Sequence, residues 1–284
     1  MRITTALDRY VLQLQADGRS PHTIVQVQRH VRLLATWMAT QKQLTDVRRL
    51  RHEHLAAFLA DPETTTRADG QPKLPTTLNA LRTTMRSFGS YCDLARYAPR
   101  NFGGLVRRAR VGPRPPRALT EGESKRLVAA LDEAQTPAER RDRALFRVML
   151  ATGIRVGSAL EARTDDVDLE AGALHLRHMK GGGTLLVPLD EAVRALLAEY
   201  VEGMPTGALF PSKDGDHLQR RSIALRFKAW IKRAGITRAA SPHSLRHTFA
   251  TRLYEASHDL MQVQQRLGHA SIVSSTVYAR AGAI

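Results

Sequence analysis

The sequence predicts a mainly α-helical protein of two domains, with a small antiparallel β-sheet in the C-terminal domain. Apolar residues recur every three or four positions over much of the chain, which is the spacing of helices with one buried face. Short segments typical of strands are found between residues 167 and 187, interrupted by a glycine-rich turn. Residues 107–117 are rich in proline and arginine and cannot build a core. Since 284 residues suffice for two domains, we place the boundary there.

Residues 1–106 are predicted to form a helical domain. Ser20 and Pro21 are typical of a helix start, and a loop is expected from Asp61 to Pro75. Three apolar stripes predict three helices around it. The stripes are Ile24, Val27, Val31, Leu34 and Met38; Leu55, Phe58 and Leu59; and Leu78, Leu81, Met85 and Phe88.

The charge of the chain indicates a polyanionic partner. The formal net charge is +16 and the isoelectric point is near 10.9, which favours nucleic acid or a membrane surface. No apolar run approaches the roughly 20 residues of a spanning helix, and no signal segment opens the chain. The single cysteine, Cys92, excludes an internal disulfide and a cysteine-rich zinc site. We expect a cytoplasmic, nucleoid-associated protein.

Most of the excess positive charge precedes residue 118. Residues 1–117 hold 20 Lys and Arg against 8 Asp and Glu, a net charge of +12, whereas the remainder holds 23 against 19, a net charge of +4. We therefore expect the first domain and the linker to bind phosphate groups; a solvated helix face and a flexible tether are the simpler alternatives. The arginines expected to contact DNA are Arg29, Arg32, Arg82, Arg86, Arg107, Arg108, Arg110, Arg114 and Arg117.

Residues 118–284 are predicted to form the larger domain. Thr120 and Glu123 make a capping box that begins its first helix. The following elements are a helix from about Arg140 to Thr152, strands at Val167 and Leu169, at Ala173 to His178 and at Leu185 to Val187, and helices at Glu191 to Tyr200 and at Ser222 to Ala234, with Trp230 in the core.

The stretch from Ser241 to Tyr278 gathers residues that carry chemistry. Ser241 and Pro242 predict a helix start, and His243 and Arg246 lie three residues apart on one face of that helix. His247 is expected to point elsewhere and to be structural. A second helix, from Asp259 to Leu267, is predicted to end at Gly268 in the left-handed conformation. His269 follows directly, and Tyr278 comes nine residues later.

The segments HSLRHTFAT, LGHASI and STVYAR, in this order, resemble the C-terminal active-site region of the tyrosine recombinases, the phage integrase family. ATGIRVGSALEAR resembles the TGxRxxEL motif of the family and adds Arg155. The resemblance implies that Lys180, in the turn MKGGG, reaches the active site from a β-hairpin. It also implies a two-domain DNA clamp, made of a small core-binding (SAM-like) domain and a catalytic domain. One position departs from the family: Ser158 replaces an acidic residue that is expected to orient the arginine.

This resemblance implies a site-specific recombinase, similar to Xer proteins and integrases, that acts without metal or cofactor. Arg155 and Arg246 would stabilise the charge that develops on the non-bridging phosphate oxygens. Tyr278 would attack and form a 3′-phosphotyrosyl link, and His243 would accept its proton or hold a phosphate oxygen. Lys180 would protonate the leaving 5′ oxygen, and His269 would donate a hydrogen bond to the phosphate.

The expected partners are double-stranded DNA with an inverted-repeat recombination site and three further copies of the chain, in a homotetramer on that DNA. Only six residues follow Tyr278, so we expect weak self-association without DNA. Two alternatives stay open. A type IB topoisomerase-like enzyme would relax supercoils without sequence preference, and a catalytically impaired DNA-binding protein would bind without cleaving.

Overall fold

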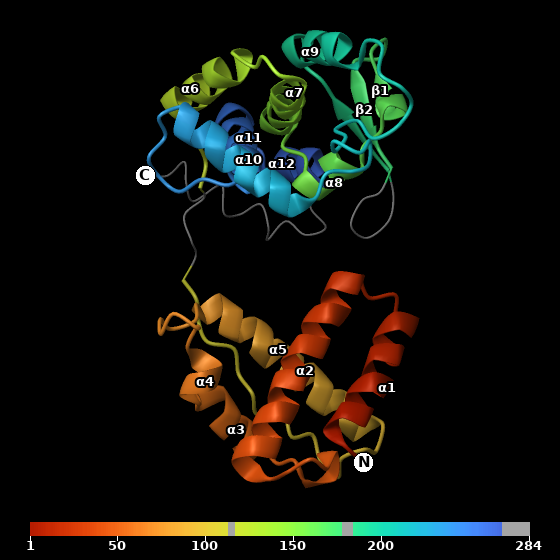
Figure 1. The fold of residues 1–284 in the computed structure, drawn as a ribbon, viewed down its shortest axis with the longest axis vertical. Helices are drawn as coiled ribbons and strands as arrows, with labels where there is room; N and C mark the ends of the chain where they lie inside the picture. Colours follow the sequence, from red (N-terminus) through yellow and green to blue (C-terminus); the bar gives the residue numbers. More distant parts are fainter. Residues whose placement is uncertain (113–116, 178–183, 269–284) are drawn as a thin grey trace. The chain divides into compact units, whose positions relative to one another are not determined.

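The computed structural model describes residues 1–112, 117–177 and 184–268 (Figure 1). The chain divides into two compact units, Met1–Gly112 and Pro113–Ile284. The division falls inside the stretch predicted as the linker. The predicted fold class is confirmed, because the units are mainly helical and the second contains a three-stranded antiparallel sheet. Four predicted site residues lie outside the described residues, namely Arg114, Lys180, His269 and Tyr278, and so does His178, the predicted end of a strand.

The first unit is a helical bundle. Its elements are α1 (Ile3–Ala16), α2 (Pro21–Lys42), a 3-10 turn (Val47–Arg49), α3 (His52–Ala60), α4 (Pro62–Thr65) and α5 (Pro75–Leu94). The three predicted stripes belong to α2, α3 and α5, and their central side chains, such as Leu34, Phe58 and Phe88, are fully buried.

Two helices of the first unit go beyond the sequence predictions. α1 buries Ile3, Leu7, Tyr10 and Leu14, which also recur every three or four positions. The short helix α4 lies in the expected loop, because the Asp61 side chain accepts a hydrogen bond from the Glu63 backbone nitrogen and caps it. The added helices complete a bundle that buries its apolar faces on one core.

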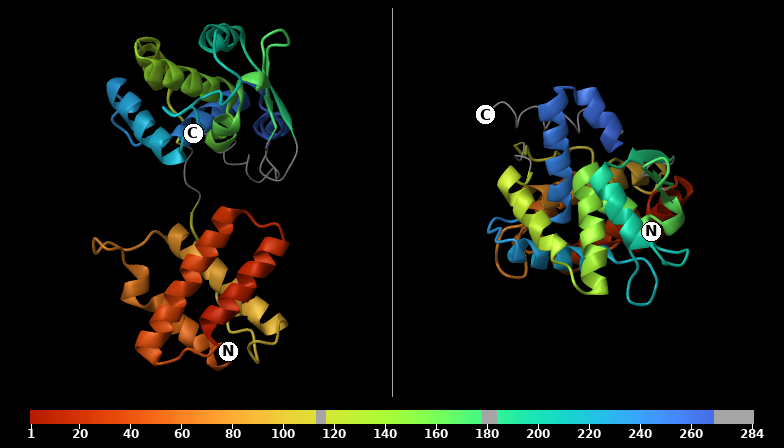
Figure 2. Two further views of the ribbon diagram at one scale, coloured as in Figure 1. Left: turned by 45° about the vertical axis from the view of Figure 1, so that its right-hand side comes forward. Right: turned by 90° about the horizontal axis from the view of Figure 1, so that it is seen from above.

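The second unit packs helices around a central helix, α7. Its elements are α6 (Glu121–Asp132), α7 (Pro137–Thr152), α8 (Val156–Glu161), a 3-10 turn (Thr164–Asp166), β1 (Val167–Asp168), β2 (Ala173–Leu176), β3 (Leu185–Pro188), α9 (Glu191–Val201), α10 (Arg220–Arg233), α11 (Pro242–Ser257) and α12 (Leu260–Leu267). α7 packs against α6, α8, α9 and α11, in the middle of the unit (Figure 2). The strands pair antiparallel in the order β1-β2-β3, with Leu174 opposite Val187.

α7 begins earlier than the sequence predicts, at Pro137 instead of Arg140. The Thr136 hydroxyl accepts a hydrogen bond from the Glu139 backbone nitrogen, and the Glu139 carboxylate accepts one from that of Thr136. This capping box, with proline in the first turn, fixes the helix start. Trp230 is 4 % exposed, and its indole nitrogen donates to the buried Asp142 of α7, as expected for a core residue.

Candidate active site

Two helices end in glycine at the same place in the second unit. α7 ends at Gly153, with a φ of 66°, and α12 ends at Gly268, with a φ of 58°. Both glycines take the left-handed conformation that the sequence predicted for Gly268, which costs other residues conformational energy. The last carbonyls of a helix have no partner within it and carry partial negative charge. These two ends therefore offer acceptors to a cation.

Arg246 of α11 occupies the space between these helix ends. Its side chain is buried, with 2 % of the residue exposed. Nη1 donates to the carbonyl oxygen of Gly153 and Nη2 to that of Leu267, both at 2.8 Å. A buried guanidinium needs such partners, because an unpaired charge in the interior is costly. The arginine thus joins the ends of α7 and α12 to α11.

Arg155 also contacts the end of α12. It precedes α8, is half-buried, and its Nη1 and Nη2 both lie 3.4 Å from the carbonyl oxygen of Gly268. Hydrogen bonds of this length are weak, so little energy opposes a change of partner. The two arginines therefore converge on neighbouring carbonyls, those of Leu267 and Gly268.

His243 lies near both arginines at the start of α11. The residue is exposed, but the partial removal of its ring from water lowers its pKa below the 6.5 of a free histidine, and the positive charges of Arg246 and Arg155 lower it further. An imidazole with a lowered pKa is neutral at neutral pH and can accept a proton. The predicted helix start is confirmed, since Ser241 is the N-cap and Pro242 the first residue.

His247 also belongs to this cluster, contrary to the expectation that it points elsewhere. Its ring lies 4.6 Å from that of His243, at an interplanar angle of 79°. Burial lowers its pKa to about 4, with smaller effects from His243, Arg246 and Arg117. The spacing of four residues from His243 places both rings on one helix face, and this signal could have identified it.

The close packing at Gly153 fixes this geometry. A Cβ atom there would lie 2.4 Å from Cδ1 of Phe249 and 2.8 Å from Cδ2 of Leu267. Only glycine allows α11 and α12 to approach the end of α7 so closely. This packing holds the carbonyl oxygen of Gly153 within reach of Arg246.

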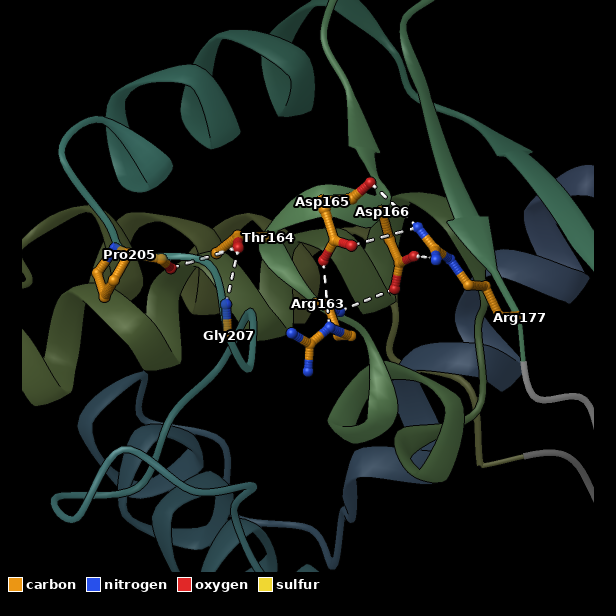
Figure 3. Close-up of polar contacts among 7 residues, drawn as sticks. All are labelled: Arg163, Thr164, Asp165, Asp166, Arg177, Pro205 and Gly207. Atoms are coloured by element: carbon orange, nitrogen blue, oxygen red, sulfur yellow. Dashed lines mark hydrogen bonds and ion pairs between the residues drawn. The ribbon is translucent and has the colours of Figure 1, made fainter.

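A second polar cluster ties the end of β2 to the turn before β1 (Figure 3). The Arg177 guanidinium pairs with the Asp166 carboxylate, which is 3 % exposed, and Asp166 also accepts from the backbone nitrogen of Arg163 at 2.9 Å. Ser158 lines a small cleft beside Asp166 and Arg177. The cluster fixes the point from which the chain enters residues 178–183.

The arginines predicted to bind DNA are mostly exposed. Arg29, Arg32, Arg86, Arg107, Arg108, Arg110 and Arg117 are exposed, and Arg82 is half-buried. None of the eight forms an ion pair with a carboxylate of the described residues. Their charge is therefore available to an anion from outside.

Other possible sites do not coincide with this cluster. A cavity of about 1330 Å³ lies at the opposite end of α7, lined by residues that include Thr136, Arg141 and Tyr200.

In the part of the chain that the structure describes, no three or more His, Cys, Asp or Glu side chains are grouped to hold a metal ion. Nor does that part contain a helix with the length and apolar character needed to span a bilayer.

Comparisons with known sequences identify relatives of the whole chain. Residues 117–283 match the model described as the phage integrase family. Tyrosine recombinase XerD of Ralstonia nicotianae is 30 % identical over 285 residues, covering 97 % of this chain and 89 % of the relative. Tyrosine recombinase XerD of Mycobacterium tuberculosis is 33 % identical over 255 residues, covering 84 % and 80 %.

Solved structures share the fold. XerH site-specific recombinase bound to its difH substrate, in a pre-cleavage complex, matches with a TM-score of 0.71 at 22 % identity, covering 97 % of this chain and 81 % of that one. A lambda integrase dimer bound to a COC′ core site matches with a TM-score of 0.74 at 20 % identity, covering 100 % and 78 %.

Proposed function

The chain belongs to the phage integrase family and is a site-specific tyrosine recombinase, and we propose that Arg155, His243 and Arg246 are three of its catalytic groups. The observation that carries this proposal is the convergence of both arginines on the ends of α7 and α12, beside His243. Arg155 lies far along the sequence from His243 and Arg246, which are three residues apart in α11. Their meeting is expected if they act on one phosphate.

The arginines act on the charge of the reacting phosphodiester. Attack at phosphorus builds negative charge on the two non-bridging oxygens, and preset donors stabilise it. Guanidinium groups stay protonated and present planar pairs of donors that fit those oxygens. Arg246, held at 2.8 Å by two carbonyls, is fixed before DNA binds. Arg155, with its 3.4 Å contacts, can turn to the phosphate at little cost.

The nucleophile is Tyr278. Its phenolic oxygen forms a bond to phosphorus, the bond from phosphorus to the 5′ oxygen breaks, and a 3′-phosphotyrosyl link results. His243 accepts the phenolic proton, a role supported by its lowered pKa. Lys180 gives a proton to the leaving 5′ oxygen, and His269 donates a hydrogen bond to the phosphate. A 5′-hydroxyl of another strand reverses the step and rejoins the DNA.

The substrate is double-stranded DNA carrying an inverted-repeat site, and the active assembly is a homotetramer on that DNA. Support comes from solved relatives, among them a lambda integrase tetramer bound to a Holliday junction. In this assignment residues 1–106 are the core-binding domain, residues 107–117 the linker and residues 118–284 the catalytic domain. Because DNA is the substrate, the protein acts in the cytoplasm, at the nucleoid. No comparison favours a relaxing topoisomerase or an inactive DNA-binding protein.

A suicide substrate tests the assignment. A nicked half-site, taken from inverted repeats that flank the gene, loses its 5′-hydroxyl fragment after cleavage and traps the protein on DNA. We expect a protein–DNA band that resists SDS with the wild type and none with Tyr278→Phe. The nucleophile assignment is wrong if Tyr278→Phe still forms the band. The enzymatic proposal fails if the wild type binds the site specifically and never forms it.

A further inference from the structure

Asn79 of α5 is a buried polar side chain whose partner lies far along the chain. It is 4 % exposed. Its Nδ2 donates to the carbonyl oxygen of Ala109 at 2.9 Å, and its Oδ1 accepts from the backbone nitrogen of Ala109 at 2.8 Å. A side-chain amide offers one donor edge and one acceptor edge, as a neighbouring strand would. Asn79 therefore holds both polar backbone groups of Ala109.

Ala109 is the last of three attachments that hold residues 102–110, here called the strap, along α5 (Figure 1). Phe102 is 2 % exposed, and a Cβ atom on Gly103 would lie 2.5 Å from the carbonyl oxygen of Met85. Val106 packs against the core of the first unit. The strap therefore runs antiparallel to α5, from Gly103 beside Met85 to Ala109 beside Asn79.

Arginines lie between the last two attachments, Val106 and Ala109, and directly after Ala109. Arg107, Arg108 and Arg110 are exposed. Arg82 donates from Nη1 to Oδ1 of Asn79 at 3.2 Å, so its guanidinium lies at the same point as Ala109. None of the four pairs with a carboxylate among the residues described, whereas in the second unit Arg147 pairs with Asp132 and Arg238 with Glu123.

We propose that Asn79 is a positioning residue for DNA binding: it fixes Ala109 so that Arg107, Arg108 and Arg110, together with Arg82, form one preset group of cations for backbone phosphates. The inference rests on the proposed function, because it takes DNA as the ligand. It differs from the view of residues 107–117 as a flexible tether, since the first part of that stretch belongs to the surface of the first unit.

The fixed conformation of the strap should increase its affinity for DNA. A disordered segment must be ordered when it binds, and this cost is subtracted from the affinity. The strap is ordered before DNA arrives, so its arginines bind phosphates without that cost.

The attachment also limits the reach of the linker. At the other end, the carbonyl oxygen of Ala118 accepts from Arg238, and the backbone nitrogen of Leu119 donates to Thr248. Only residues 110–117 lie between the two attachments. Their fully extended length is at most about 30 Å.

The first experiment uses the full-length protein without DNA. Asn79→Leu replaces the side chain by one of similar size that makes neither hydrogen bond to Ala109 nor the one from Arg82. Ala109→Pro removes the backbone donor of the Asn79–Ala109 pair. Limited trypsin digestion should cut the wild type slowly after Arg107 and Arg110, and each variant about tenfold faster. Because both changes break one pair, the double variant should be cut no faster than the faster single variant. Equal cutting of wild type and both variants would overturn the proposal.

The second experiment measures DNA affinity against salt concentration. Asn79→Leu should weaken binding about tenfold at low salt and lower the slope of log K against log salt by about 2, since fewer phosphates are neutralised. Simple loss of folded protein would lower the active fraction and leave that slope unchanged. Arg107→Ala is the matched control for losing one contact, with a slope reduced by about 1.

The outcomes separate this inference from the proposed function. A wild-type protein that binds and cleaves its site, with Asn79→Leu matching it in affinity and slope, refutes the role of Asn79 alone. A wild-type protein that binds no DNA refutes both. Faster trypsin cutting together with a reduced salt slope supports the role of Asn79.

Discussion

Arg155 and Arg246 donate hydrogen bonds to consecutive main-chain carbonyls, those of Gly268 and Leu267. Arg246 belongs to α11 and Arg155 lies between α7 and α8, and the two side chains meet because α7 and α12 both pack against α11. Two fixed charges at one point repel each other in the absence of an anion. The carbonyls at the end of α12 offset this repulsion in the DNA-free protein, and a phosphate does so more strongly.

Replacing either arginine by lysine should reduce cleavage by about 100-fold or more. A lysine keeps the charge and loses the planar pair of donors. Arg246→Lys should also lower the melting temperature, because one ammonium cannot serve the carbonyls of Gly153 and Leu267 in the same way. Arg155 is half-buried with weaker contacts, so Arg155→Lys should leave stability nearly unchanged. Suicide-substrate cleavage and thermal unfolding measure the two effects.

Gly153→Ala should destabilise the protein by more than the ~1–3 kcal/mol that backbone strain alone costs, and it should reduce cleavage. The new Cβ would both occupy a positive φ and collide with Phe249 and Leu267. Gly203 is the matched control: it has a φ of 71° and no heavy atom within 4 Å of the position that a Cβ would take, so Gly203→Ala adds only the backbone strain. In urea unfolding, the free energy of unfolding of Gly153→Ala should be well below that of Gly203→Ala. Equal stability of the two variants would show that the close packing at Gly153 is unimportant.

Acid should destabilise the protein through His247. Its folded-state pKa is about 4, below the 6.5 of the unfolded chain. Between these values the unfolded state binds the proton and the folded state does not, so stability is present above pH 6.5 and falls as the pH drops to 4. The loss should be on the order of 2 kcal/mol. His247→Gln removes this titration, so its urea stability should decline less than that of the wild type over the same range.

The rate of DNA cleavage should stay high in mildly acidic solution. If His243 accepts the proton of the nucleophile, the acid limb of the single-turnover rate reports its pKa, which partial desolvation and the arginine charges lower below 6.5. Half-maximal cleavage at a pH above 6.5 would argue against His243 as the base.

Local signals in the sequence predict much of this site. Ser241 and Pro242 indicate the start of α11, and glycines indicate the ends of α7 and α12, because helix capping depends on a few adjacent residues. The family motifs then identify Arg155 and Arg246. Their actual partners, the carbonyls of Gly153, Leu267 and Gly268, are not predictable, since carbonyls carry no sequence signal.

Contacts between distant segments are not predictable either, because the sequence around one residue does not identify its distant partner. Asn79 looks like an ordinary residue of an amphipathic helix, and nothing in its neighbourhood indicates Ala109 as its partner. His247 directly follows Arg246 in the sequence, which suggests a different helix face, whereas its spacing from His243 is what brings the two rings together. Periodicity identifies which face of a helix is buried and leaves open what it is buried against.

Thr248→Val should weaken the attachment of the linker to α11. The Thr248 hydroxyl accepts a hydrogen bond from the backbone nitrogen of Leu119 at 2.7 Å and donates to the carbonyl oxygen of Ser244 at 2.8 Å, and the residue is 1 % exposed. Valine has the same shape without the acceptor, so the buried nitrogen of Leu119 loses its partner, at a cost of about 1–3 kcal/mol. Thr248→Ser keeps the hydroxyl and should retain the bond. Hydrogen exchange at Leu119 should accelerate in the valine variant alone. Since α11 also carries His243 and Arg246, slower cleavage in that variant with intact DNA affinity would show that the linker end helps to hold the catalytic helix; unchanged exchange would contradict the attachment itself.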